Sequence, residues 1–178
     1  MGACACSDER KVSSQSKYCF FTYGFVPQYQ KTLFRVNRVT LECETVVDNR
    51  LNFENLLTVQ VDKDLFGYQH MGSPVRLVLF AGLNSGQYAM IKKAPPIIAR
   101  EFPSSPLNYN DVALFVTGGR NGNDESVPFY KSVDMYDIRS NAWTQVPRMN
   151  HERAMHCVCL LGSAIYAFGG IKNDQMEL

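Results

Sequence analysis

A glycine pair that closes a short apolar run occurs twice in the chain. Val112–Thr117 leads into Gly118-Gly119, and Ala164–Phe168 leads into Gly169-Gly170. Short runs of β-forming residues that end at glycine are typical of strands. A glycine there lets the chain leave the strand with positive φ, or lets a neighbouring backbone approach closely. The second glycines of the two pairs are 51 residues apart, which predicts a supersecondary unit that repeats with a period of about 50 residues.

Two further signals complete the repeating unit between the glycine pairs. Tyr136-Asp137 and Asn141-Ala142-Trp143 bracket a turn that leads into another strand. The aromatic rings of Tyr136 and Trp143 are large enough to fill the space between layers of sheet. The pattern therefore predicts antiparallel strands near residues 112–117, 131–137, 142–146, 155–160 and 164–168.

In this order and spacing, the features resemble the kelch repeat. The resemblance implies packing and turn roles for the residues of the kelch signature. These residues are Gly118, Gly119, Tyr136, Trp143, Arg153, Gly169 and Gly170. It also implies an all-β fold, an incomplete kelch-type β-propeller. At about 50 residues a blade, the chain holds about three and a half four-stranded blades.

The repeat divides the chain unevenly. We expect a flexible leader over residues 1–17, degenerate blades over 18–111, the best-matching blade over 112–150 and a partial blade over 151–178. Shifted by 100 residues, Val36 falls on Tyr136 and Cys43 on Trp143. Thr32–Val47 therefore resembles the last two strands of an earlier blade.

Region 51–111 has weaker signals. Leu56–Val61 and Val75–Leu83 have the apolar character of strands, and Tyr88–Ile91 follows as a shorter candidate. Gly82 resembles a worn copy of the glycine signature, although it precedes Gly118 by only 36 residues. Several prolines interrupt the segment after these strands. The sequence does not assign these strands to blades.

Propellers close with about four to eight blades, more than this length provides. We therefore expect a truncated or fragmentary member of the family, with open strand edges and one exposed blade face. Such a surface favours self-association.

The first seven residues form a separate signal. Gly2 follows the initiating methionine, and Cys4, Cys6 and Ser7 follow among small residues. The pattern resembles N-myristoylation at Gly2 with palmitoylation at Cys4 and Cys6, although Cys6 stands where the myristoylation pattern places Ser or Thr. A second acyl chain is what makes such an anchor stable. The alternative is an unmodified leader.

Composition narrows the function further. The net charge of +1 gives no reason to expect nucleic acid as a partner. No apolar stretch approaches the length of a membrane span. The six cysteines do not form a disulfide framework, because Cys157 and Cys159 alternate on one predicted strand and share a face. We expect a reducing, cytoplasmic location, which includes attachment at the cytoplasmic face of a membrane.

No residue pattern predicts a reaction or a cofactor. His151, His156, Cys157 and Cys159 crowd one strand and its approach, whereas zinc sites draw paired ligands from two places in the chain. The cysteines alternate as core positions do. His70 stands alone in a polar stretch, where a histidine is ordinarily a surface residue. We therefore expect no metal and no enzyme.

The sequence thus favours a non-enzymatic protein-interaction module, a kelch-type adaptor or scaffold. Loops on a rigid scaffold are where binding usually occurs. The candidate partner-binding loop follows the first glycine pair and includes Arg120, Asn121, Asn123, Asp124 and Glu125. Two alternatives remain, both implied by the resemblance: a propeller enzyme similar to galactose oxidase, and the substrate-receptor part of a ubiquitin ligase.

Overall fold

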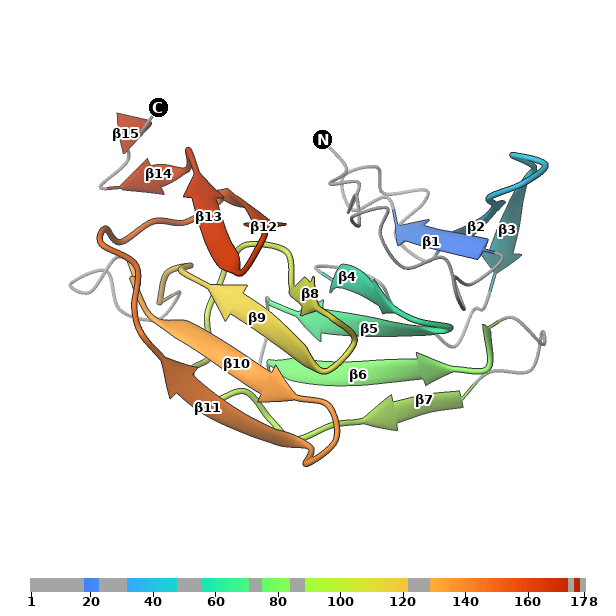
Figure 1. Cartoon of the computed structure of the whole chain (residues 1–178), viewed down its shortest axis with the longest axis horizontal. Helices are drawn as coiled ribbons and strands as arrows, with labels where there is room; N and C mark the ends of the chain where they lie inside the picture. The colour runs from blue at the N-terminus through green and yellow to red at the C-terminus, as the bar shows by residue number, and fades with distance from the viewer. Residues whose placement is uncertain are drawn as a thin grey trace.

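The computed structural model describes residues 18–22, 32–47, 56–70, 75–83, 89–121, 129–172 and 175–176. All secondary-structure elements in these ranges are β-strands, so the predicted all-β class is confirmed. Within the same ranges no helix is long and apolar enough to cross a membrane. The strands form antiparallel sheets that succeed one another in chain order (Figure 1).

The N-terminal sheet has the strand order β1-β2-β3. Its strands are β1 (Tyr18–Thr22), β2 (Thr32–Asn37) and β3 (Cys43–Val47). Val36 pairs with Cys43, just as Tyr136 pairs with Trp143 one hundred residues later, so the predicted offset is confirmed.

The turns of these two hairpins also match. Asn37 Oδ1 accepts a hydrogen bond from the Thr40 amide at 3.3 Å, and Asp137 Oδ1 accepts one from the Ser140 amide at 2.6 Å. Leu41 and Asn141 occupy the left-handed region with φ of 59° and 54°. A short acceptor side chain at the start of the turn therefore sets the same geometry in both hairpins.

The second sheet contains four strands in the order β4-β5-β6-β7. They are β4 (Leu56–Val61), β5 (Asp64–Gln69), β6 (Arg76–Ala81) and β7 (Ala89–Lys92). Three of them were predicted, and β5 was not. The interpretation of Gly82 as a worn glycine signature is wrong, because Gly82 follows the third strand of its sheet whereas Gly118-Gly119 follows the second.

The third sheet has the strand order β11-β10-β9-β8. Its strands are β8 (Leu107–Tyr109), β9 (Ala113–Thr117), β10 (Val133–Asp137) and β11 (Ala142–Val146). The last three are strands that the sequence predicted. The first, β8, lies before residue 112, so this sheet begins five residues earlier than the expected boundary.

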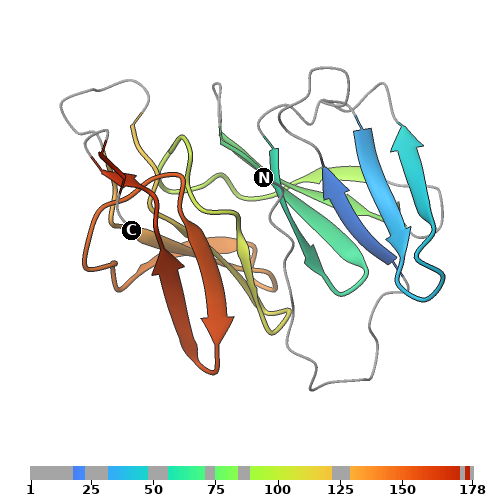
Figure 2. The ribbon, with the colours of Figure 1, turned by 90° about the horizontal axis from the view of Figure 1, so that it is seen from above.

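A hairpin follows, formed by β12 (Cys157–Leu161) and β13 (Ala164–Phe168), as predicted. A second, very short hairpin joins β14 (Ile171–Lys172) and β15 (Gln175–Met176). Turned by 90°, the molecule shows β1–β3 and β12–β13 on opposite sides (Figure 2). The described sheets do not close into a ring.

The core lies between successive sheets. Leu33 of β2 packs with Leu65 and Phe80 of the second sheet in one cluster of buried side chains. The larger cluster joins the second sheet to the third, and its members include Phe66, Tyr68, Leu114, Val116 and Tyr136. Each fully buried side chain of this size contributes about 1.5–3 kcal/mol. Face-to-face packing of sheets therefore holds the array together, as in propeller blades.

Candidate functional site

Three connecting segments meet at one end of the third sheet. They precede β8, join β9 to β10 and join β11 to β12. Glu101 and Arg120 pair through their backbones, with N–H···O distances of 2.9 and 2.8 Å. The Met155 amide donates to the Phe102 carbonyl at 2.9 Å. We call residues 100–106, 118–121, 129–132 and 147–156 the loop end. The turns at 38–42, 62–63, 110–112, 138–141 and 162–163 form the turn end.

A buried arginine forms the centre of the loop end. The Arg100 guanidinium donates to the carbonyls of Gly118 at 2.9 Å and Ser132 at 3.2 Å, and to Asp134 Oδ2 at 2.6 Å. The side chains of Arg100 and Asp134 are 0% and 1% exposed. Burial raises the pKa of Asp134, and the charge of Arg100 opposes that rise. Because both partners are buried, removal of one leaves an uncompensated charge.

Both the backbone conformation and the close approach of neighbouring backbone atoms require glycine at the first glycine pair. Gly118 and Gly119 have φ of 61° and 92°. A Cβ on Gly118 would collide with the Arg153 carbonyl oxygen, and one on Gly119 would lie 2.7 Å from the Glu101 oxygen. The two reasons that the sequence offered for this pair, positive φ and close backbone approach, therefore both apply.

The same contacts recur in the next unit. Arg153 donates to the Gly169 carbonyl at 2.6 Å, as Arg100 donates to Gly118. Ala154 and Ile171 pair through their backbones, as Glu101 and Arg120 do. The repeat is thus a repeat of tertiary contacts as well as of sequence.

Sequence reasoning missed Arg100, although a signal for it exists. Arg100 precedes Arg153 by 53 residues, and Pro103 precedes His156 by the same distance. The glycine pairs are 51 residues apart, so this 53-residue offset departs by two residues from the repeat register, which aligns Arg153 with Phe102.

Tyr136 and Trp143 lie between sheets, where the sequence expected them. The Trp143 ring contacts the rings of Tyr136 at 5.2 Å and of Tyr68, in the second sheet, at 6.4 Å between centroids. Its indole N–H donates to the Ala94 carbonyl at 2.8 Å. Asn141 Oδ1 accepts from the Ala94 amide at 3.1 Å and from the Tyr136 hydroxyl at 2.7 Å. The β10–β11 hairpin is therefore tied to the preceding sheet by rings and by polar contacts.

Two histidines are buried near the loop end. His156 Nε2 lies 2.6 Å from Thr117 Oγ1, and burial, aided by the charge of Arg153, lowers the His156 pKa to about 4. His70 is also buried, and its Nδ1 accepts from the Phe102 amide at 3.3 Å. Burial lowers its pKa to about 4. The expectation that His70 is a surface residue is wrong, because the Phe102 ring covers it at 5.6 Å between centroids.

The candidate partner-binding loop is described only at its start. The Arg120 guanidinium lies over the Phe102 ring at 5.1 Å and is 3.7 Å from the Glu101 carboxylate. Asn121 follows, half-buried. The other three residues of the prediction, Asn123, Asp124 and Glu125, lie outside the described residues, as do the lipidation candidates Gly2, Cys4 and Cys6.

Cys157 and Cys159 share a face of β12, as predicted, and neither is in a disulfide. Both are exposed, so their assignment to the core is wrong: the half-buried face of the hairpin carries Val158, Ile165 and Ala167 instead. Among the described residues no three His, Cys, Asp or Glu side chains come together as metal ligands would.

Comparison with known proteins supports the repeat assignment. Residues 113–150 match the model of the Kelch motif. Kelch-like protein 36 of Rattus norvegicus is 34% identical over 65 residues, which are 36% of this chain and 10% of that protein. The Kelch repeat and BTB domain-containing protein F47D12.7 of Caenorhabditis elegans is 31% identical over 70 residues, 39% of this chain and 11% of that protein. The chain thus spans about a tenth of the length of these curated relatives.

The successive antiparallel sheets are consistent with the blades of a β-propeller, and in the last two units an arginine donates to the carbonyl of the first glycine of a glycine pair. The match to the Kelch motif makes this assignment specific for residues 113–150, and over that part the chain is similar to kelch-repeat proteins.

Proposed function

We propose that this chain is a non-catalytic protein-interaction module that presents its loop end to a partner protein. The observation that carries the proposal is the way the loops are fixed. Backbone pairs join the three connecting segments, and the buried pair of Arg100 and Asp134 anchors them to the sheet. Loops held on a rigid scaffold lose little conformational freedom when they bind, which favours recognition.

The polar groups buried beneath the loop end support a structural role for that layer. Arg100, Asp134, Thr117 and His156 contact one another or backbone carbonyls. Groups used in this way stabilise the fold rather than face a substrate. The loop that begins at Arg120 is then the contact element.

Quantitative affinity purification tests this proposal. The loop variant carries Asp124→Lys with Glu125→Lys, and the matched control carries Glu42→Lys with Asp64→Lys at the turn end. We expect the loop variant to lose a protein partner that the wild type and the control retain, with unchanged circular dichroism for all three. Loss in the control alone, or equal retention in both variants, would contradict a loop-end contact.

We further propose that acylation at Gly2, with Cys4 or Cys6, tethers the module to the cytoplasmic face of a membrane. The small residues at positions 2–7 support this proposal. Mass spectrometry of the N-terminal peptide should find a fatty acyl group on Gly2, and Gly2→Ala should release the protein from membrane fractions. A free or acetylated Gly2 would refute the tether and leave the interaction proposal intact.

A further inference from the structure

Two large apolar side chains project from the turn between β2 and β3. Val39 and Leu41 are 82% and 74% exposed, the two highest values among the exposed large hydrophobic side chains of the described residues. A single exposed apolar side chain is ordinary on a protein surface. Two of them on one turn, neither packed against a sheet, indicate a contact with something other than the rest of the fold.

The turn holds both side chains in a fixed conformation. The Leu41 amide donates to the Asn37 carbonyl at 2.8 Å, and the Asn37 amide donates to the Glu42 carbonyl at 2.9 Å. Asn37 Oδ1 also accepts a hydrogen bond from the Val39 amide at 2.9 Å. Leu41 has a φ of 59°, whereas Asn141, with 54°, holds the equivalent position in the third sheet. Asparagine tolerates this left-handed conformation, but leucine loses stability there and in this turn gains little burial, which favours a functional role.

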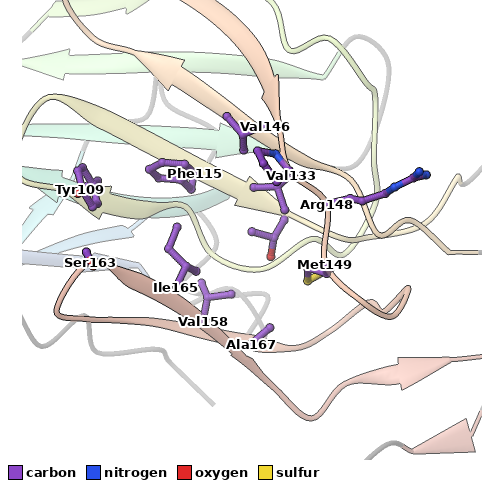
Figure 3. Close-up of a pocket in the computed structure, with 12 residues that line it drawn as sticks. Tyr109, Phe115, Val133, Val146, Arg148, Met149, Val158, Ser163, Ile165 and Ala167 are labelled. Atoms are coloured by element: carbon purple, nitrogen blue, oxygen red, sulfur yellow. The ribbon is translucent and has the colours of Figure 1, made fainter.

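The last hairpin also exposes apolar surface, for a different reason. Among the described residues β12 and β13 pair only with each other, whereas the third sheet has four strands. A largely apolar cavity of about 490 Å³ lies between them, with Phe115 and Val146 on one side and Ile165 on the other (Figure 3). A four-stranded sheet like the third would extend over this cavity, so the cavity does not indicate a docking surface. The β2–β3 turn is different, because a strand added at the edge of a sheet does not cover a turn at its end.

The chain enters the first sheet beside this turn. β1 is antiparallel to β2, and Tyr18, the first residue of β1, is opposite Asn37, where the turn begins. Residues 1–17, which contain the proposed acylation sites, therefore join the fold at the turn end. Anchoring of this segment in a bilayer favours an orientation with the turn end toward the lipid.

The rest of the turn end is compatible with a membrane surface. In Figure 2 the β2–β3 and β8–β9 turns lie toward the same, lower side of the molecule, and Val112 of the β8–β9 turn is 56% exposed. The turn end carries as many basic as acidic side chains, which are Arg38, Lys63, Arg139, Glu42, Asp62 and Asp111. Because it has no net charge, its contact with lipid depends on the apolar side chains.

We propose that the β2–β3 turn inserts Val39 and Leu41 into the interface of a lipid bilayer, as a second contact beside the acylated segment. The inference rests on the membrane tether proposed above. A single acyl chain binds a membrane only marginally, so a rigid apolar turn at the point where that segment enters the fold strengthens the attachment. The loop end then faces away from the membrane, where a partner protein has access to it.

The turn is tested independently of acylation. The full chain is held on phosphatidylcholine vesicles through an N-terminal hexahistidine tag and a nickel-chelating lipid, which replace the acyl anchor at the same end of the chain. Leu41→Trp places a fluorophore on the turn, and brominated phosphatidylcholine quenches a tryptophan that enters the bilayer. We expect quenching of Leu41→Trp beyond that of the wild type, in which Trp143 is the single tryptophan. Met155→Trp, at the loop end, should show no quenching beyond the wild type.

The affinity for the same vesicles is a second measurement. Val39→Ser with Leu41→Ser should bind at least about tenfold more weakly than the wild type, equivalent to about 1.4 kcal/mol. The matched control is Met155→Ser with Tyr166→Ser, which replaces two side chains of 53% and 45% exposure outside the turn end. It should bind as the wild type does. A higher ionic strength should leave the affinity nearly unchanged, because the turn end has no net charge.

Circular dichroism of all these variants should match that of the wild type. The proposal is overturned if Leu41→Trp is not quenched, if Met155→Trp is quenched equally, or if the Val39→Ser, Leu41→Ser variant binds as tightly as the wild type. It is also overturned if sedimentation shows that a second copy covers the turn, as a larger species that this variant does not form. An unacylated Gly2 together with quenching of Leu41→Trp would refute the acyl tether alone and support the membrane contact of the turn.

Discussion

Replacement of Trp143 by alanine tests the packing of the third sheet on the second. Truncation of a large buried aromatic side chain costs about 3–5 kcal/mol. Trp143 is only half-buried, which places the expected loss near 3 kcal/mol. Two contributions make up most of it: ring contacts with Tyr136 and Tyr68, about 0.5–1.5 kcal/mol each, and the hydrogen bond to the Ala94 carbonyl, about 1 kcal/mol.

Trp143→Phe separates these contributions, because it keeps a ring and removes the indole donor. We expect a loss of about 1–2 kcal/mol for this variant, since the Ala94 carbonyl loses its partner. The assay is urea unfolding followed by circular dichroism. Trp143 is the single tryptophan of the chain, so its fluorescence would not report on the variants. Met155→Ala, which removes a side chain that is 53% exposed, serves as the control and should change stability by less than about 0.5 kcal/mol.

The reasoning is refuted if Trp143→Ala lowers the free energy of unfolding by less than about 1 kcal/mol, because truncation of a tryptophan packed between two sheets costs more than that. Equal losses for Trp143→Phe and Trp143→Ala would instead show that the rings contribute nothing beyond the hydrogen bond.

Three other changes have defined outcomes in the same unfolding assay. Arg100→Met should lower the free energy of unfolding by about 3–5 kcal/mol, because it leaves Asp134 buried without its counter-ion. The double variant Arg100→Met with Asp134→Leu should recover most of that loss. No recovery would argue against a buried ion pair. Gly118→Ala should destabilise the protein more than Gly162→Ala by at least about 1 kcal/mol. The two residues have nearly equal φ angles of 61° and 62°, but of the two only Gly118 faces a close backbone oxygen. Equal losses of stability would contradict this close approach. Burial, aided by the charge of Arg153, lowers the His156 pKa from 6.5 in the unfolded chain to about 4 in the folded protein. The unfolded state therefore binds more protons below pH 6.5, so stability should fall as the pH drops from about 6.5 to 4, and less steeply in His156→Gln.

The strands around the glycine pairs could be predicted because their signals are local. A short apolar run bounded by Gly, Asn or Asp indicates a strand without knowledge of its neighbours, and β9 to β13 all follow this rule. The β2–β3 hairpin followed from the 100-residue offset, although neither aromatic residue of the repeat is present there.

Features that depend on neighbouring sheets could not be read in this way. β5 contains Gly67, which weakens a strand pattern, yet a Cβ there would lie 2.9 Å from the Leu56 side chain. The glycine leaves room for the Leu56 side chain, a contact that only the folded sheet reveals. His70 likewise stands in a polar stretch and is buried because Phe102, 32 residues later, covers it.

Arg100 shows the same limit at the candidate site. Its role depends on the carbonyls of Gly118 and Ser132 and on Asp134, all from segments that follow it in the chain. An arginine in a proline-containing segment carries no local sign of burial. The contact with a glycine carbonyl, which Arg153 repeats, is what connects the two residues.

Amide hydrogen exchange measured residue by residue tests the central claim, that the third sheet and the unit after it are joined by backbone hydrogen bonds. The Gly119 amide donates to the Arg153 carbonyl at 2.8 Å, and the Met155 amide donates to the Phe102 carbonyl at 2.9 Å. We predict that both amides exchange slowly, as the amides of β9 and β10 do, because they are hydrogen-bonded between the two units. Rapid exchange at these two positions beside protected strands would contradict the account, because the two units would then be independent of one another.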